Sequence, residues 1–222
     1  MVGGIPADRR RDPVHVSTQD LSALSERLHR IVSSASFLDM KGLANEVPIF
    51  IQTYSPSQED GLRKMVVALG NRLMTSGTQV SVIDLFELVL QELADEDMLD
   101  DLIRDEPTYP RKDMFDTLKN MSDPTTRLIP RLIRAMGPSG TQLTMLTGAG
   151  RVYPFLRTHT ILEALQPAML RHPVVLFFPG EYVQEIGGGS SLRLFGTLPS
   201  PTIYNPYYRA TNLDHYKLAP TT

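Results

Sequence analysis

Two glycine-containing loops have the residue types that suit phosphate binding. Thr147–Pro154 has the sequence TGAGRVYP and follows an apolar segment, and the three consecutive glycines Gly187–Gly189 precede another. Glycine lets the backbone approach an anion closely, so the N–H groups of such loops can surround a phosphate. The first loop lacks the third glycine of a dinucleotide fingerprint. The sequence therefore favours a tight turn with positive φ in the first loop and a hairpin loop in the second.

A nucleotide-hydrolysing enzyme would place its phosphate loop after the first strand. Here Val47–Tyr54 is the first strand-like segment, and the turn after it, TYSPSQ, has neither a glycine run nor a lysine. Asp84 ends the next apolar segment, where a Walker-type enzyme holds magnesium. Without the phosphate loop, helix capping is the favoured role for Asp84.

Acid–base chemistry has one candidate pair, His159 and Glu181, and the sequence does not place the two within hydrogen-bonding distance. The chain has no cysteine, which excludes thiol nucleophiles, disulfides and zinc ribbons. Seven acidic residues between Asp95 and Glu106 lack the central glycine and terminal glutamate of a calcium loop. We therefore predict no catalytic residues, no metal site and no cofactor.

Arg127, Arg131 and Arg134 share one face of a predicted helix and could contact phosphate or an acidic partner. A solvated helix surface is favoured, and these arginines can also face the acidic segment that precedes them. The chain has 22 basic and 25 acidic residues, a formal net charge of -3, whereas nucleic-acid binders are usually basic. Direct DNA contact is therefore not expected.

Runs of β-branched and aromatic residues predict the strands, and three-and-four spacing of apolar residues predicts the helices. Strands and helices alternate along the chain, which indicates an α/β fold: an open, mostly parallel sheet of about five strands with helices on both faces and an N-terminal helix. The predicted strands are 47–54, 79–85, 142–146, 173–178 and 191–195, and the predicted helices include 17–32, 56–76, 109–120 and 126–136.

With 222 residues and 41% hydrophobic content, the chain can bury one substantial core. We expect a flexible arm over 1–16, a single α/β domain over 17–213 and a frayed tail over 214–222. No apolar run approaches the roughly 20 residues that span a bilayer, and the N-terminus lacks the apolar core of a signal peptide. A cytoplasmic protein without membrane contact is expected.

Four segments carry a family resemblance: LTGAGRVYPFLRTHTILEALQ, HPVVLFFPGEY, SLRLFG and YYRATNL. Together they resemble the B component of bacteriophage-exclusion (BREX) systems, the BrxB family, most distinctly over the C-terminal third. The family is encoded with a methyltransferase, an ATPase and an alkaline-phosphatase-like protein. The resemblance implies a part in phage defence and in the methylation that marks host DNA, and it carries over no catalytic residue.

The resemblance further implies an adaptor that binds the alkaline-phosphatase-like component (PglZ) and, beyond it, the ATPase and the methyltransferase. The alternative is a degenerate domain that binds nucleotide within the complex. Loops after the strands and the tyrosine-rich C-terminal segment supply the candidate surface, since aromatic side chains are favoured at interfaces. Its residues are Gly148, Gly150, Arg151, Tyr153, His159, Glu181, Tyr182, Arg193, Tyr207, Tyr208 and Arg209.

Overall fold

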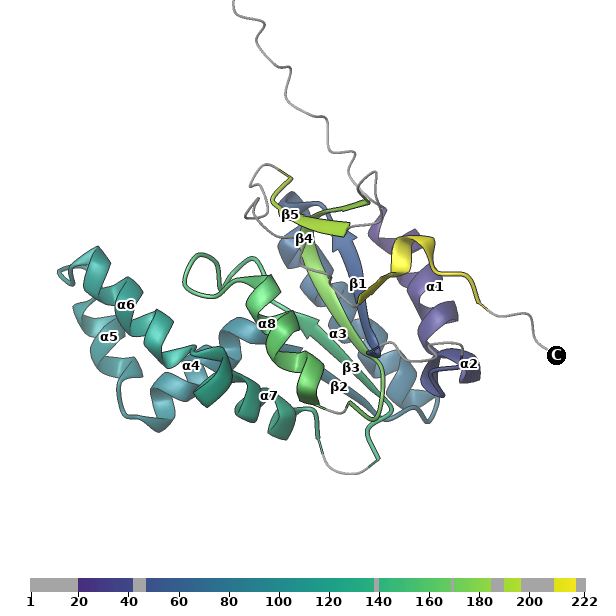
Figure 1. The fold of residues 1–222 in the computed structure, drawn as a ribbon, viewed down its shortest axis with the longest axis horizontal. Coiled ribbons are helices and arrows are strands. Elements are labelled where there is room, and N and C mark those ends of the chain that lie inside the picture. Colours follow the sequence, from purple (N-terminus) through teal and green to yellow (C-terminus); the bar gives the residue numbers. More distant parts are fainter. Residues whose placement is uncertain are drawn as a thin grey trace, which may run out of the picture.

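A six-stranded sheet occupies the centre of the molecule, with strand order β2-β3-β4-β1-β6 and β5 paired to β4 (Figure 1). The neighbours in this order are all parallel, and only β5 runs antiparallel. The computed structural model describes residues 20–41, 47–137, 140–168, 170–184, 190–196 and 210–218. The predicted α/β fold with a mostly parallel sheet is confirmed. The strands are β1 Ile49–Tyr54, β2 Val80–Asp84, β3 Leu143–Thr147, β4 Val174–Gln184, β5 Ser190–Leu194 and β6 Ala210–Asn212.

Successive residues of the central strands pack into two different cores. Ile49 and Ile51 of β1 contact one apolar cluster, whereas Phe50 and Tyr54 contact the other. Side chains of a strand alternate between the faces of a sheet, so an almost continuously apolar strand is buried on both sides. The residues of β4 from Val174 to Phe178 follow the same alternation between the two cores.

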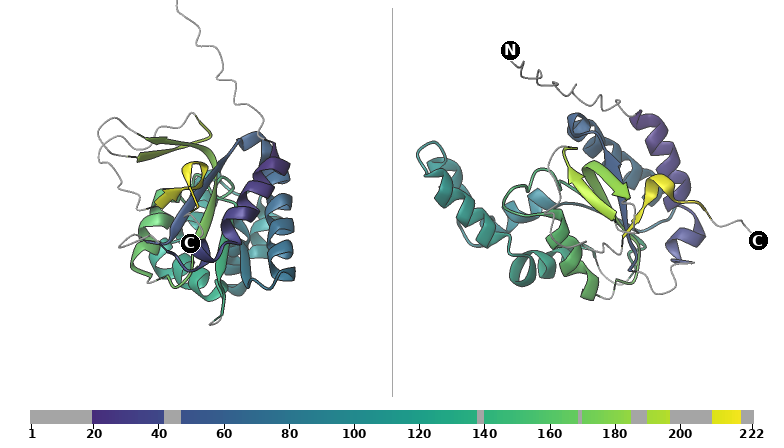
Figure 2. Two further views of the ribbon diagram at one scale, coloured as in Figure 1. Left: turned by 90° about the vertical axis from the view of Figure 1, so that its right-hand side faces the viewer. Right: turned by 45° about the horizontal axis from the view of Figure 1, so that its top comes forward.

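Helices cover both faces of the sheet (Figures 1 and 2). One face is covered by α1 Leu21–Val32, α2 Ala35–Leu38 and α3 Glu59–Thr75, and the other by α4 Leu85–Asp95, α7 Ile129–Ala135 and α8 Thr158–Leu165. The crossover from β1 to β2 runs to one edge of the sheet, while the later crossovers run back toward the opposite edge. Right-handed crossovers in opposite directions place their helices on opposite faces.

An arm of two helices, α5 Leu99–Asp105 and α6 Arg111–Met121, projects away from the sheet together with the end of α4 (Figure 1). A small apolar cluster centred on Leu93, Leu102 and Met121 holds the arm together. The helix predicted over 109–120 is present as α6. The helix predicted over 126–136 is present as α7, preceded by a π-helical turn at Pro124–Leu128.

Two boundaries and one short strand differ from the sequence predictions. The strand predicted over 173–178 is longer, since β4 continues to Gln184 and pairs with β5 as a hairpin. The short strand β6 was not predicted. The first described helix begins at Leu21 and is capped by Asp20, which accepts hydrogen bonds from the backbone N–H groups of Ser22 and Ala23. The predicted start of this helix, at residue 17, lies outside the described residues.

The first residues of the predicted frayed tail are held against the sheet. The carboxylate of Asp214 accepts hydrogen bonds from Gln52, Thr53 and Arg27 at distances of 2.7 to 3.1 Å. Gln52 is fully buried in β1 and also accepts a 2.7 Å hydrogen bond from Arg27 of α1. A buried amide needs such partners, so the segment around Asp214 satisfies a polar residue of the central strand. The predicted arm over 1–16 lies outside the described residues.

Within the described residues, no helix is long and apolar enough to cross a bilayer.

Candidate functional site

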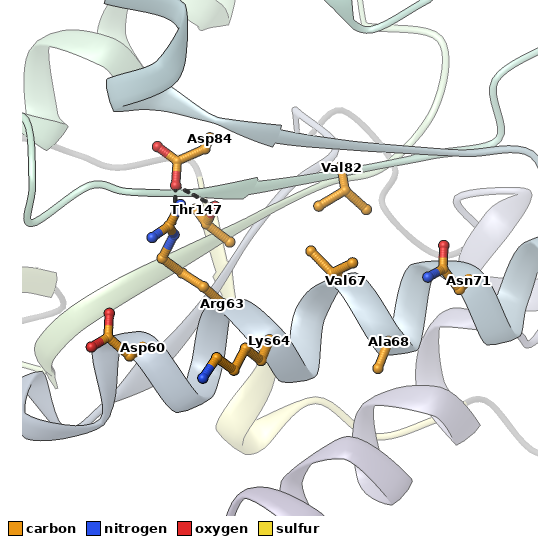
Figure 3. A pocket seen from close by; sticks show the side chains of 9 residues that line it. All are labelled: Asp60, Arg63, Lys64, Val67, Ala68, Asn71, Val82, Asp84 and Thr147. Carbon is orange, nitrogen blue, oxygen red and sulfur yellow. Dashed lines mark hydrogen bonds and ion pairs between the residues drawn. The ribbon is translucent and has the colours of Figure 1, made fainter.

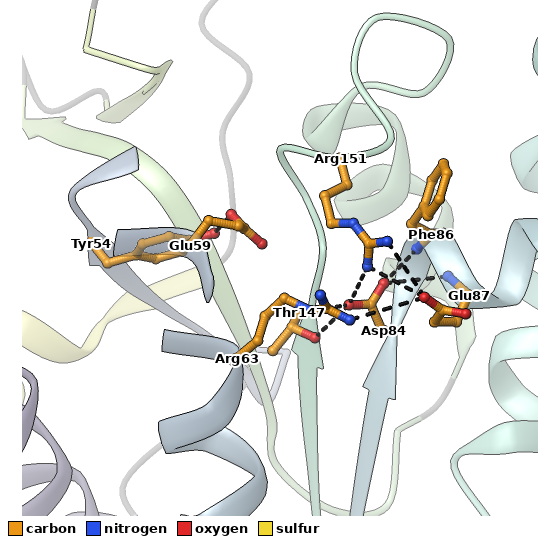
Figure 4. A network of polar contacts seen from close by, with 8 residues as sticks. All are labelled: Tyr54, Glu59, Arg63, Asp84, Phe86, Glu87, Thr147 and Arg151. Carbon is orange, nitrogen blue, oxygen red and sulfur yellow. Dashed lines mark hydrogen bonds and ion pairs between the residues drawn. The ribbon is translucent and has the colours of Figure 1, made fainter. Parts of the chain in front are cut away.

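The carboxyl ends of β2 and β3 carry a network of charged side chains centred on Asp84 (Figure 4). Asp84 ends β2, Thr147 ends β3, and the loop containing Gly148 and Arg151 follows directly. Arg63 reaches the same place from α3. Ligands of open α/β sheets bind at this end of the strands, so this network is the candidate site.

Asp84 has a full set of partners from its own chain. Its carboxylate accepts hydrogen bonds from the backbone N–H of Phe86 at 2.9 Å and of Glu87 at 3.3 Å, and so caps α4. The predicted capping role is confirmed. Its second oxygen lies 2.9 Å from Nε of Arg63 and 3.1 Å from Nη1 of Arg151, and it accepts a 3.3 Å hydrogen bond from Thr147. The Asp84 side chain is only 11% exposed.

Arg151 is fixed by three contacts. Besides Asp84, its guanidinium lies 3.4 Å from Glu87 and 4.5 Å from the ring centroid of Phe86. Stacking on an aromatic face and pairing with two carboxylates leave a guanidinium little freedom. Arg151, which the sequence analysis places on a partner or ligand surface, thus has these contacts within its own chain.

The glycines of the loop are explained by close packing. Gly148 has φ of +81°, as predicted for a tight turn, and a Cβ there would lie 2.6 Å from Oδ1 of Asp84. A Cβ on Gly150 would lie 2.8 Å from Pro179 and 3.2 Å from the ring of Phe195. Both glycines thus make room for other parts of the chain.

The start of α3 is poorly suited to an anion. Its first turn contains Glu59 and Asp60, whose charges oppose the binding of a phosphate at the helix N-terminus. The hydroxyl of Tyr54, at the end of β1, donates a hydrogen bond to Glu59 (Figure 4). Burial and this hydrogen bond raise the pKa of Tyr54 far above its usual value, so the phenol stays protonated as a donor.

The other predicted surface residues are divided among several places. Tyr153 packs edge-on against Phe195, with ring centroids 6.0 Å apart. Tyr182 donates a 3.4 Å hydrogen bond to the carbonyl of Ala210, and Arg193 is exposed on β5 opposite Glu181. Burial lowers the pKa of His159, and no hydrogen bond among the described residues joins it to Glu181. Tyr207, Tyr208 and Arg209 lie outside the described residues.

The predicted basic helix face is largely neutralised. Arg127 contacts Glu92 at 2.9 Å and Glu96 at 2.8 Å, while Arg131 contacts Glu92 at 2.5 Å and also pairs with Asp95. Burial tends to raise the pKa of Glu92, but the hydrogen bonds from the two arginines outweigh it and lower the pKa. The acidic and basic segments therefore face each other, as the sequence allowed.

An open groove of about 540 Å³ lies beside the network, between α3 and β2 (Figure 3). Val67 of α3 faces Val82 of β2 across it, Asn71 lies toward one end, and Arg63, Asp84 and Thr147 lie at the other. Sequence reasoning selected neither Arg63 nor Lys64, which also lines the groove. Two adjacent basic residues in an amphipathic helix usually lie on its solvated face. Only the strand order, which brings α3 beside β2, reveals that these two line a groove.

No cluster of three or more potential metal-ligating side chains occurs in the described part of the chain.

Comparisons with known proteins agree in one family. The family model described as "BREX protein BrxB" matches residues 81–213. A protein of Bacillus cereus (strain H3081.97) with the same description is 32% identical over 201 residues, which covers 86% of this chain and 97% of that protein. One from Escherichia coli O9:H4 (strain HS) is 24% identical over 189 residues, covering 79% and 92% respectively. No solved structure was found to match significantly.

Proposed function

Since this chain belongs to the BrxB family of BREX phage-defence proteins, we propose that it is a non-catalytic adaptor of the BREX complex. In this role it binds the alkaline-phosphatase-like component (PglZ) and thereby supports phage restriction and host DNA methylation. The ATPase and the methyltransferase join the BREX complex through the pair formed by this chain and the alkaline-phosphatase-like component. The proposed adaptor acts in the cytoplasm, where phage DNA is copied and host DNA is methylated.

One observation carries the non-catalytic part of this proposal. At the carboxyl ends of the strands, where an α/β enzyme holds its ligand, Asp84 is already bonded to Arg63, Arg151, Thr147 and the N-terminus of α4. A catalytic carboxylate must be within reach of the proton or metal of its substrate. Asp84 instead joins three elements of the fold, so it supports a rigid surface rather than a reaction.

Co-expression with the alkaline-phosphatase-like component tests the adaptor role. We expect an affinity-tagged form of this chain to retain that component through washes from 50 to about 500 mM salt, because an interface of standard size does not rest on screened surface charges alone. Size-exclusion chromatography of the eluate gives the measurement. Separate elution of the two proteins at every salt concentration would contradict the proposal.

Nucleotide binding is the alternative, and the site geometry argues against it. Both glycines of the GAG loop face protein atoms, and α3 begins with two acidic residues. We therefore expect no rise in Tm with millimolar ATP and magnesium. A ligand present at 100 times its Kd stabilises the folded state by about 2.7 kcal/mol, which differential scanning fluorimetry detects readily. A reproducible rise of several degrees would favour the nucleotide-binding alternative.

A further inference from the structure

The edge of the sheet at β2 has a free row of backbone groups beside an apolar groove. β2 is the terminal strand of the described sheet and pairs only with β3. The carbonyl of Gln79 accepts hydrogen bonds from the N–H groups of Gln142 and Leu143 on the β3 side. Backbone groups alternate between the two sides of a strand, so the N–H and C=O groups of Val80 and Val82 point outward. No strand of the described sheet lies on that side of β2.

The groove lies where the side chains of an added strand would project. Val82 points toward α3, and Val67 faces it from the helix (Figure 3). A strand paired to β2 would alternate its side chains between the two faces of the sheet. Those on the α3 side would enter the groove and cover Val67, which is 51% exposed. The free edge and the apolar groove are therefore parts of one surface.

The charged side chains of the groove further restrict which segment can bind there. Arg63 is committed to Asp84 and Glu87, whereas Lys64 takes part in no ion pair with the described residues. Lys64 lines the same groove together with Asp60, which likewise takes part in no ion pair with the described residues. An acidic and a basic side chain of the bound segment would give Lys64 and Asp60 the partners that the described part of their own chain does not supply. An ammonium paired at an interface contributes to specificity and to the association rate.

We propose that the β2 edge binds an extended segment of the partner protein by strand addition. The segment has apolar side chains at alternate positions, which fill the groove over Val67 and Val82. It also has an acidic residue near Lys64 and a basic residue near Asp60. Main-chain hydrogen bonds to Val80 and Val82 supply affinity, and the groove supplies specificity, as in other strand-addition complexes. This assignment rests on the adaptor function proposed above and names the surface through which the adaptor acts.

A charge placed in the groove tests the assignment without altering the strand. Because Val67 is exposed, Val67→Glu should fold normally, and its carboxylate would lie under the added strand and draw Lys64, one turn away on α3, from the acidic residue of the partner. We expect its affinity for the alkaline-phosphatase-like component to fall by about tenfold or more. Ile133→Glu is the matched control, since Ile133 is a 43% exposed apolar residue of α7 on the opposite face. The control should bind within about twofold of the unmodified chain.

Hydrogen exchange gives a second readout. Binding of the partner should slow exchange at the amides of Val80 and Val82, which point outward, in the unmodified chain but not in Val67→Glu. This assignment would be overturned if Val67→Glu captures the alkaline-phosphatase-like component as well as the unmodified chain does and the amides of β2 gain no protection. The adaptor function would then remain intact. If the unmodified chain captures nothing, both fall. A dimer of the chain alone with β2 protected would assign the edge to a second copy and overturn the proposal.

Discussion

Replacing Asp84 with alanine is expected to lower the free energy of unfolding by about 3 kcal/mol, because three kinds of contact are lost together. α4 loses its cap, and Arg63 and Arg151 lose their shared carboxylate. Both arginines are partly exposed, at 34% and 27%, so water compensates them in part. For a chain of this length the loss corresponds to a fall in Tm of roughly 6 to 12 °C, measurable by calorimetry.

Two matched variants separate these contributions. Asp84→Asn keeps a side chain that caps helices well but removes the charge, so its effect should be about half that of Asp84→Ala. Glu87→Gln removes a carboxylate that is 48% exposed and contacts Arg151 at 3.4 Å, and should cost less than about 0.5 kcal/mol. An Asp84→Ala protein as stable as the unmodified chain would show that the network does not stabilise the fold.

Gly180→Ala is expected to disrupt the β4–β5 hairpin. Gly180 has φ of +153°, and a Cβ there would lie 2.1 Å from the backbone oxygen of Arg193 and 3.0 Å from the backbone N of Phe195. Backbone atoms cannot move aside as a flexible side chain can, so strain and overlap should together cost about 3 kcal/mol or more. Hydrogen exchange should accelerate across the paired residues Gly180–Gln184 and Ser190–Leu194.

Gly77→Ala is the control for this prediction. Gly77 also has positive φ, +93°, but no atom lies within 4 Å of the place where its Cβ would be. Gly77→Ala should lower the free energy of unfolding only by the cost of placing a side chain at positive φ, about 1 to 2 kcal/mol. Hydrogen exchange in the β4–β5 hairpin should not become faster. Equal effects of the two substitutions on the hairpin amides would show that the close approach at Arg193 is not what makes Gly180 necessary.

The strands and the two-sided core could be predicted because their signal is local. PVVLFF is apolar at every position, and the structure buries its residues alternately in the two cores. The capping role of Asp84 was likewise predictable, since an aspartate between a strand and a helix has few better uses. The family resemblance was also predictable from sequence alone, because its segments are long and specific.

The site could not be predicted, because its members meet only through strand order. Arg63 belongs to the helix that follows β1, yet β1 lies three positions from β2 in the sheet. Only the long crossover of α3 brings that arginine to Asp84. The continuation of β4 was missed for a different reason. Pro179 has no N–H group and usually ends a strand, but here it lies where β4 leaves the parallel sheet to pair with β5.

The two edges of the sheet have unequal consequences for assembly. At one edge, β6 has three residues and leads directly into the turn that holds Asp214. Very short edge strands discourage pairing with another chain. β2, at the other edge, has five residues. Pairing of another strand with this sheet is therefore favoured at the β2 edge and disfavoured at the β6 edge.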